Sequence, residues 1–131
     1  KDGLHLGAEA PVRTVLTIID GVLAGEGEGP LAPADVRLGA VLASTDPVAV
    51  DLAAVRLMGF DETKIEKLAG PMRDEGQRIT AVREAADVSV GEVRAGVDGV
   101  TEQSLDDITA DSPFEPHAGW VGHVERAPTN R

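Results

Sequence analysis

The chain has 131 residues, which is the length of one domain. Hydrophobic residues make up 42% of it, enough to form a core. Its 23 acidic residues outnumber its 12 lysines and arginines, so the net charge is -11. Because this charge repels a phosphate backbone, we expect no binding to nucleic acid. The chain has no cysteine, so it forms no disulfide and by itself ligates no iron–sulfur cluster.

The hydrophobic runs of the chain are all shorter than the roughly 20 residues that span a bilayer, so we expect no membrane segment. No signal peptide is visible, and we therefore expect a cytoplasmic location. The first residue is Lys1 and not a methionine. We expect an N-terminal part of the same protein to precede it.

Two strands around a glycine-rich loop are predicted for the first part of the chain. Residues 14–19 are continuously apolar and β-branched, which indicates a buried strand in a parallel or central position. Residues 25–35 contain several glycines and prolines, so we expect a loop. A second buried strand is predicted over 36–43.

The clearest helix start lies at Asp46 and Pro47. The Asp46 carboxylate can accept hydrogen bonds from free backbone amides, and Pro47 suits the first helical position. This helix is expected to run to about residue 58 and to stop at Gly59, which favours a left-handed cap. A second, short helix is predicted from Asp61 to the Gly-Pro pair at 70–71.

The second part of the chain has weaker periodicity. Residues 79–93 predict either a helix followed by a strand over 88–93, or two strands. We therefore expect an α/β core over residues 1–95 and a largely irregular tail over 96–131, packed on the core by Phe114, Pro116 and Trp120. The expected fold class is α/β or α+β, with a small mixed or mostly parallel sheet and flanking helices.

The segment from Gly25 to Pro30 alternates glycines with two glutamates. Glycines at this spacing let a backbone approach a ligand closely. Glu26 and Glu28 stand where a phosphate-binding loop would carry a lysine, so the segment suits a cation, a hydroxyl-rich ligand or a metal-bound phosphate. A hairpin-like connection with solvated acids is the alternative interpretation.

Three aspartates flank this segment, each with a structural alternative. Asp20 and Gly21 end the first strand, and ligands of open α/β sheets gather beyond strand ends, although the pair also suits a simple turn. Asp46 is foremost a helix cap. Asp51 lies in an apolar helix, where an ionised carboxylate must find a partner, become neutral or hold a metal. Arg13, Arg37 or backbone amides are its candidate structural partners.

These segments, in order, resemble the C-terminal portion of the DUF362 family, a domain of unknown function. The resemblance is carried over about 14–70 by a strand ending in Asp-Gly, the Glu-Gly-Glu-Gly-Pro loop, a strand with Gly39, the Asp-Pro-Val-Ala-Val-Asp helix, and Leu-Met-Gly after it. The tail over 114–123 is also similar to the ending of some members. The resemblance implies an uncharacterised family in which some members carry ferredoxin-type cysteine motifs. This chain has none of those cysteines.

Two functional hypotheses follow from these residues. The first is a small-ligand or divalent-cation site, with Mg²⁺, Mn²⁺ or Ca²⁺ held by Asp20, Glu26 and Asp51. Its full set of candidate residues is Asp20, Gly21, Glu26, Gly27, Glu28, Gly29, Pro30, Asp46 and Asp51. The second is a non-catalytic accessory module of an iron–sulfur or redox system, with a redox partner or a homo-oligomeric state. No reaction is assigned by either, and a purely structural role for the same residues is a third interpretation.

Overall fold

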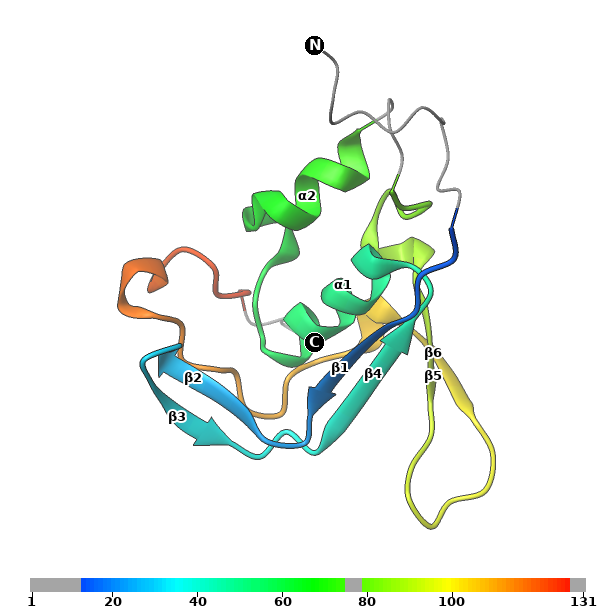
Figure 1. Cartoon of the computed structure of the whole chain (residues 1–131), viewed down its shortest axis with the longest axis horizontal. Coiled ribbons are helices and arrows are strands. Elements are labelled where there is room, and N and C mark those ends of the chain that lie inside the picture. The colour runs from blue at the N-terminus through cyan, green and yellow to red at the C-terminus, as the bar shows by residue number, and fades with distance from the viewer. Residues whose placement is uncertain (1–12, 75–78, 128–131) are drawn as a thin grey trace.

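The computed structural model describes residues 13–74 and 79–127. Within these ranges the chain forms three two-stranded antiparallel sheets and two α-helices (Figure 1). In chain order the elements are β1 (Thr17–Gly21), β2 (Ala24–Glu28), β3 (Ala32–Val36), β4 (Ala40–Ser44), α1 (Pro47–Leu57), α2 (Glu66–Arg73), β5 (Ser89–Glu92) and β6 (Thr101–Ser104). This arrangement is α+β, the second of the two expected classes.

Helix α1 begins and ends as its sequence predicts. Asp46 is the N-cap and Pro47 the first helical residue. The helix ends at Leu57, and Gly59 follows with a φ of +76°, a left-handed conformation that glycine adopts without strain. Hydrophobic side chains cover much of its surface because α1 packs against β1 and β4 on one side and against α2 on another.

The first sheet differs from the prediction. β1 pairs antiparallel with β4, with Ile19 opposite Leu42 and Asp20 opposite Val41, so the expected buried strand in a parallel or central position was wrong. Leu42 packs against the core, whereas Val41 is 61% exposed. Successive side chains of a strand point to opposite faces, so this sheet has one face on α1 and one bare face.

The glycine-rich segment is a hairpin and not a loop. β2 pairs antiparallel with β3, and Glu26 lies opposite Ala34. Alternation of glycine and glutamate has the two-residue period of a strand, and Pro33 is tolerated because β3 is an edge strand in the described structure. The hairpin-like connection that the sequence left open is thus what forms.

The end of the second helix was misplaced. Helix α2 continues through Gly70 and Pro71 to Arg73, because Leu68, Ala69 and Met72 are buried on one face and their burial offsets a lost backbone hydrogen bond. β5 (Ser89–Glu92) lies within the strand predicted over 88–93, and it pairs with β6 across residue 95. A 3₁₀ turn (Ala85–Asp87) precedes it where the sequence predicted a helix or a first strand.

The core consists of two hydrophobic clusters joined by a buried ion pair. One cluster lies between α1, α2 and the β5–β6 region, and its buried members are Val48, Leu52, Ala53, Leu68, Met72, Val82, Val88 and Leu105. The other contains Phe60, Phe114 and Val124. Phe114 is buried, as the sequence predicts, whereas Trp120 is 49% exposed.

Neither α-helix of the described ranges has the length and hydrophobicity that a membrane span requires.

Arg56 of α1, 3% exposed, donates from Nε to Glu62 Oε2 at 2.9 Å and from Nη2 to Asp106 Oδ1 at 3.1 Å. Glu62 itself is 7% exposed. The pair lies at the junction of α1, the turn after it and the segment after β6. Both charges are shielded from water, so each needs the other to offset the free-energy cost of its burial.

Glu62→Gln is expected to lower the free energy of unfolding by about 3–5 kcal/mol, because Arg56 would keep a buried charge with a weakened partner. The matched control is Glu66→Gln, which removes an exposed ion pair with Arg73 and should cost at most about 1 kcal/mol. Chemical denaturation of both variants measures the difference. Equal losses would contradict a central role for the buried pair.

Candidate functional site

Asp20 and Gly21 lie at the end of β1, on the sheet that covers α1. Asp20 Oδ1 accepts a hydrogen bond from the Val22 amide at 3.0 Å, which is a local turn contact. Since Asp20 pairs with Val41, its side chain lies on the bare face, on the opposite side of the sheet from α1. Gly21 is buried, and a Cβ there would lie 3.1 Å from the Ala40 carbonyl oxygen.

The glutamates of the β2–β3 hairpin contact the C-terminal tail. Glu26 Oε2 accepts from the Glu115 amide at 2.7 Å, and the Gly27 amide donates to the Glu115 carbonyl at 2.8 Å. Glu28 Oε2 lies 3.5 Å from His117 Nε2. These contacts fasten the tail to the hairpin, so Glu26 has a structural partner.

The hairpin turn completes the glycine-rich set. The Gly29 amide donates to the Gly27 carbonyl at 2.9 Å, and Gly27 has a φ of +70°. Gly29 and Pro30 are both exposed. The glycines therefore serve a tight turn in this hairpin.

Asp46 has the most hydrogen bonds of the candidate acids. Its Oδ1 accepts from the Val48 and Ala49 amides at 2.9 and 3.1 Å. Its Oδ2 accepts from the Thr80 hydroxyl at 2.7 Å and from the Ala81 amide at 3.2 Å. One carboxylate thus caps α1 and ties it to a segment 34 residues away, as a structural residue would.

Asp51 differs from the other candidates. Its side chain is exposed, and among the described residues neither Arg13, Arg37 nor any other group forms a hydrogen bond or ion pair with it. Partial burial raises the pKa of its carboxyl above the ordinary value. Asp51 is therefore the one proposed acid that the described structure leaves available to a ligand.

The described residues do not assemble the proposed metal ligands. Within residues 13–74 and 79–127 there is no group of three or more His, Cys, Asp or Glu side chains that could hold a metal ion. Asp20 points away from the helix that carries Asp51, and Glu26 is engaged with the tail. A cation site made by all three acids therefore has no geometric support.

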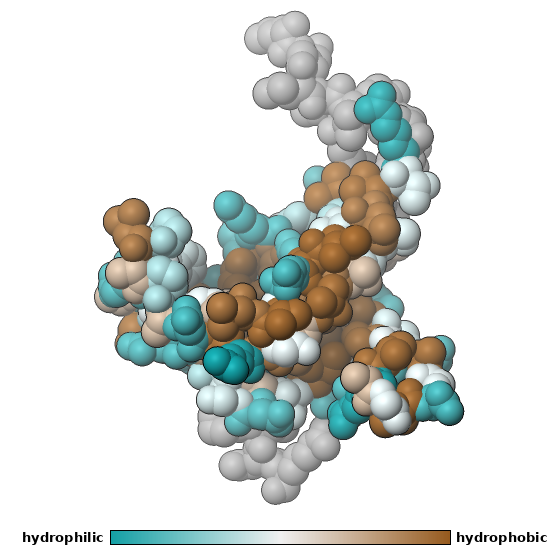
Figure 2. Space-filling model, turned by 60° about the horizontal axis from the view of Figure 1, so that its bottom comes forward, coloured by the Kyte–Doolittle hydropathy of each residue, from teal (hydrophilic) through white to brown (hydrophobic). Residues whose placement is uncertain are grey.

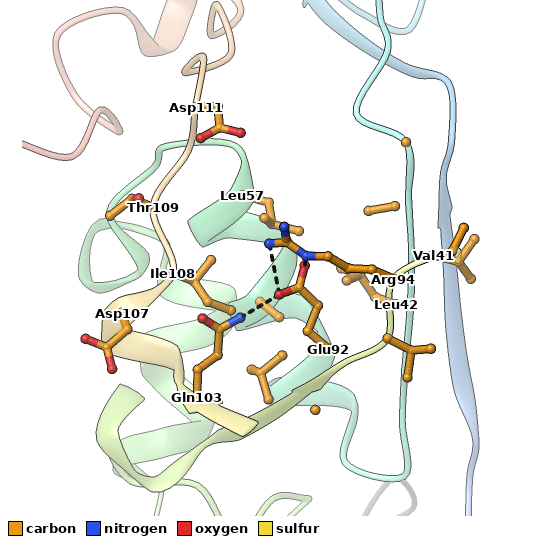
Figure 3. A pocket seen from close by; sticks show the side chains of 17 residues that line it. Val41, Leu42, Leu57, Glu92, Arg94, Gln103, Asp107, Ile108, Thr109 and Asp111 are labelled. Carbon is orange, nitrogen blue, oxygen red and sulfur yellow. Dashed lines mark hydrogen bonds and ion pairs between the residues drawn. The ribbon is translucent and has the colours of Figure 1, made fainter. Parts of the chain in front are cut away.

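A groove lies elsewhere, between β4 and the β5–β6 hairpin (Figure 3). It has a volume of about 600 Å³. Residues 39–42 line one wall and residues 90–95 the other. Ala53 and Leu57 of α1 contribute apolar surface together with Ile108. The sequence did not indicate this groove, because one of its walls comes from the second part of the chain, where periodicity is weak, and only the tertiary structure brings that wall beside β4.

Charged side chains cross this groove from the β5 side. Arg94 Nε donates to Glu92 Oε1 at 2.7 Å, and Gln103 of β6 reaches Glu92 Oε2 at 3.5 Å (Figure 3). The hydrogen bond with Glu92 and the attraction of its charge raise the pKa of Arg94, with a smaller contribution from Asp111. The lining holds three acids, Glu92, Asp107 and Asp111, against the single cation Arg94. The groove is therefore net negative.

Residues 6–56 match the model of the family described as a domain of unknown function, DUF362. The chain resembles DUF362. The matched segment runs from before β1 to near the end of α1 and includes every candidate site residue from Asp20 to Asp51. It confirms the resemblance for residues 14–56 of the range that the motifs indicated, while residues 57–70 and the tail lie outside it. No curated protein and no solved structure matches the chain.

Asp46→Ala, within the matched residues 6–56, should destabilise the fold by roughly 2–4 kcal/mol, since it removes a helix cap and leaves the buried Thr80 hydroxyl without its acceptor. Asp20→Ala, which loses one exposed turn contact, is the control and should change stability by less than about 0.5 kcal/mol. Urea denaturation compares the two. If Asp46→Ala lowers the free energy of unfolding no more than the control does, Asp46 does not hold α1 to residues 80–81.

Proposed function

We propose that this DUF362-like chain is a non-catalytic accessory module that docks on an apolar surface of a partner protein through the outer face of the β1–β4 sheet. The observation that carries the proposal is the uncovered outer face itself, on which the exposed hydrophobic side chains of Ile18 and Val41 lie beside Asp20. Single exposed hydrophobic residues are ordinary, but contiguous ones on a sheet face mark interaction surfaces.

Ile18 and Val41 stand on the outer face of adjacent strands and are 62% and 61% exposed. The chain on either side of β1 adds further exposed side chains, so that hydrophobic surface gathers in a band across the face brought forward in Figure 2. The exposed members along this segment are Val15, Leu16, Ile18, Val22, Leu23 and Val41. A two-stranded sheet with an uncovered apolar face gains stability when another layer packs on it.

The charges of the chain favour a different protein as the partner over a second copy. Each copy carries a net charge of -11, and bringing two copies together is opposed by this repulsion. The DUF362 resemblance adds an iron–sulfur or other redox protein as the expected class of partner, because ferredoxin-type motifs occur in some members of that family. The present chain contributes no cysteine to such a cluster.

Replacement of Ile18 and Val41 by threonine should abolish capture of the partner from the native host. Both substitutions remove apolar surface from the outer face, and threonine still favours the strand conformation. The matched control replaces Val97 and Val100, 60% and 63% exposed in the β5–β6 connection, by threonine and should leave capture unchanged. Quantitative mass spectrometry of the captured proteins measures both. Equal capture by the two variants would contradict docking through this face.

Binding of a divalent cation or small ligand is the second candidate function, and Asp51 is the observation that favours it. Its carboxylate is exposed and without a partner in the described part of the chain. Mg²⁺, Mn²⁺ and Ca²⁺ are often bound through one or two carboxylates together with water or a ligand. In this form the site needs Asp51 but not Asp20 or Glu26.

Under this second candidate, millimolar Mg²⁺, Mn²⁺ or Ca²⁺ should raise the melting temperature of the chain, since binding to the folded state stabilises it. Asp51→Asn should remove that rise, whereas Asp35→Asn, which deletes an exposed carboxylate of β3, should keep it. Thermal-shift titration is the measurement. No shift with any of the three ions would exclude the cation version.

A further inference from the structure

We propose that the groove between β4 and the β5–β6 hairpin binds an extended polypeptide segment, with alternating apolar and basic residues, as a third strand along the free edge of β4. The inference deepens the proposed function, because it names the chemistry of a partner segment. It uses the edge of β4, whereas the proposed docking surface is the outer face of the same sheet.

The lining of the groove shows that strand edges form its walls. Four consecutive residues, 39–42, line one side, and residues 90–92 of β5 line the other. A pocket over a sheet face would be lined by alternate residues, because neighbouring side chains point to opposite faces. Consecutive residues indicate that the backbone edge itself faces the groove.

Both edges are open in the described structure. β4 pairs only with β1, and β5 pairs only with β6, among residues 13–74 and 79–127. An unpaired edge presents backbone amides and carbonyls that another extended chain can bond. Addition of a strand to such an edge is an established mode of peptide recognition, with affinity from the main chain and specificity from alternate side chains.

The side chains of the groove define the preferred sequence of the added strand. Ala53, Leu57 and Ile108 form an apolar floor for every second side chain of the incoming segment. The remaining side chains would face a surface that carries three acids and the one cation Arg94. This net negative lining favours lysine or arginine at those alternate positions.

Other occupants fit less well. A second copy of this chain would bring its own net charge of -11 to an already negative groove. The same acids repel nucleic acid. A compact small molecule would leave the row of backbone groups along β4 without partners, whereas an extended peptide satisfies them over its length.

The experiment uses synthetic peptides of about six residues, the usual length of a strand, in which valine and lysine alternate. Binding to the whole chain is followed by fluorescence anisotropy. The control peptides have the same sequence, but one is N-methylated at every lysine and the other at every valine, so that each lacks the donors along one edge. A glutamate-for-lysine peptide tests the charge.

The unmodified valine–lysine peptide should bind, the glutamate peptide should not, and at least one of the two N-methylated peptides should lose binding because it presents no donors to β4. Asp111→Asn should weaken binding about two- to fivefold, since one exposed groove charge is lost. Asp35→Asn removes the same charge from β3, outside the groove, and should change affinity less.

Equal binding of all lysine peptides, methylated or not, would show that charge alone attracts them. That result would contradict binding of the peptide as an added strand on β4. Absence of binding by the unmodified peptide would overturn the proposal altogether. A doubling of the chain's mass in solution that Asp111→Asn abolishes would assign the groove to a second copy. Ile18→Thr alone, which changes the outer face but no residue that lines the groove, should weaken capture of the partner and retain peptide binding, so failure of the face and failure of the groove are separable.

Discussion

The structure depends on the buried ion pair between Arg56 and Glu62. Arg56 projects from α1 into a region with almost no solvent, where Glu62 and Asp106 supply its acceptors. The Arg126 guanidinium lies 4.0 Å from the same glutamate. Three parts of the chain, residues 56–62, Asp106 and Arg126, thus meet at one point. Removal of either Arg56 or Glu62 would leave the other as a buried charge without its partner. This constraint brings the segment after β6 and the C-terminal tail against α1.

With α1 fixed in this way, the hydrophobic core occupies one side of the β1–β4 sheet. The inner face packs against the helix through Leu42, while the outer face carries Ile18 and Val41 without cover in the described structure. The same placement sets the β5–β6 hairpin beside the free edge of β4 and creates the groove. Two surfaces suited to polypeptide partners therefore arise from one packing arrangement. The acids that the sequence predicts as ligands are, apart from Asp51, engaged in turns, caps and tail contacts.

Local sequence signals were reliable where a single short-range interaction decides the structure. The start of α1 follows from a carboxylate at the N-cap and a proline at the first position, and both act within one turn. They were misleading where two structures share the same local pattern. Glycines alternating with glutamates suit a ligand-binding loop and a strand equally, and pairing with β3 made the segment a strand. Likewise, a β-branched apolar run predicts a strand but does not show whether both of its faces are buried.

The sequence by itself determined the absence of cysteine chemistry, the capped helix α1 and the resemblance to DUF362, because these depend on composition or on residues close together in the chain. Only the tertiary structure decided the fate of the carboxylates. Asp46 bonds to Thr80 and Glu26 to the Glu115 amide, at separations of 34 and 89 residues. Which polar groups meet across such separations depends on how the apolar faces pack, and it cannot be inferred from a local sequence pattern.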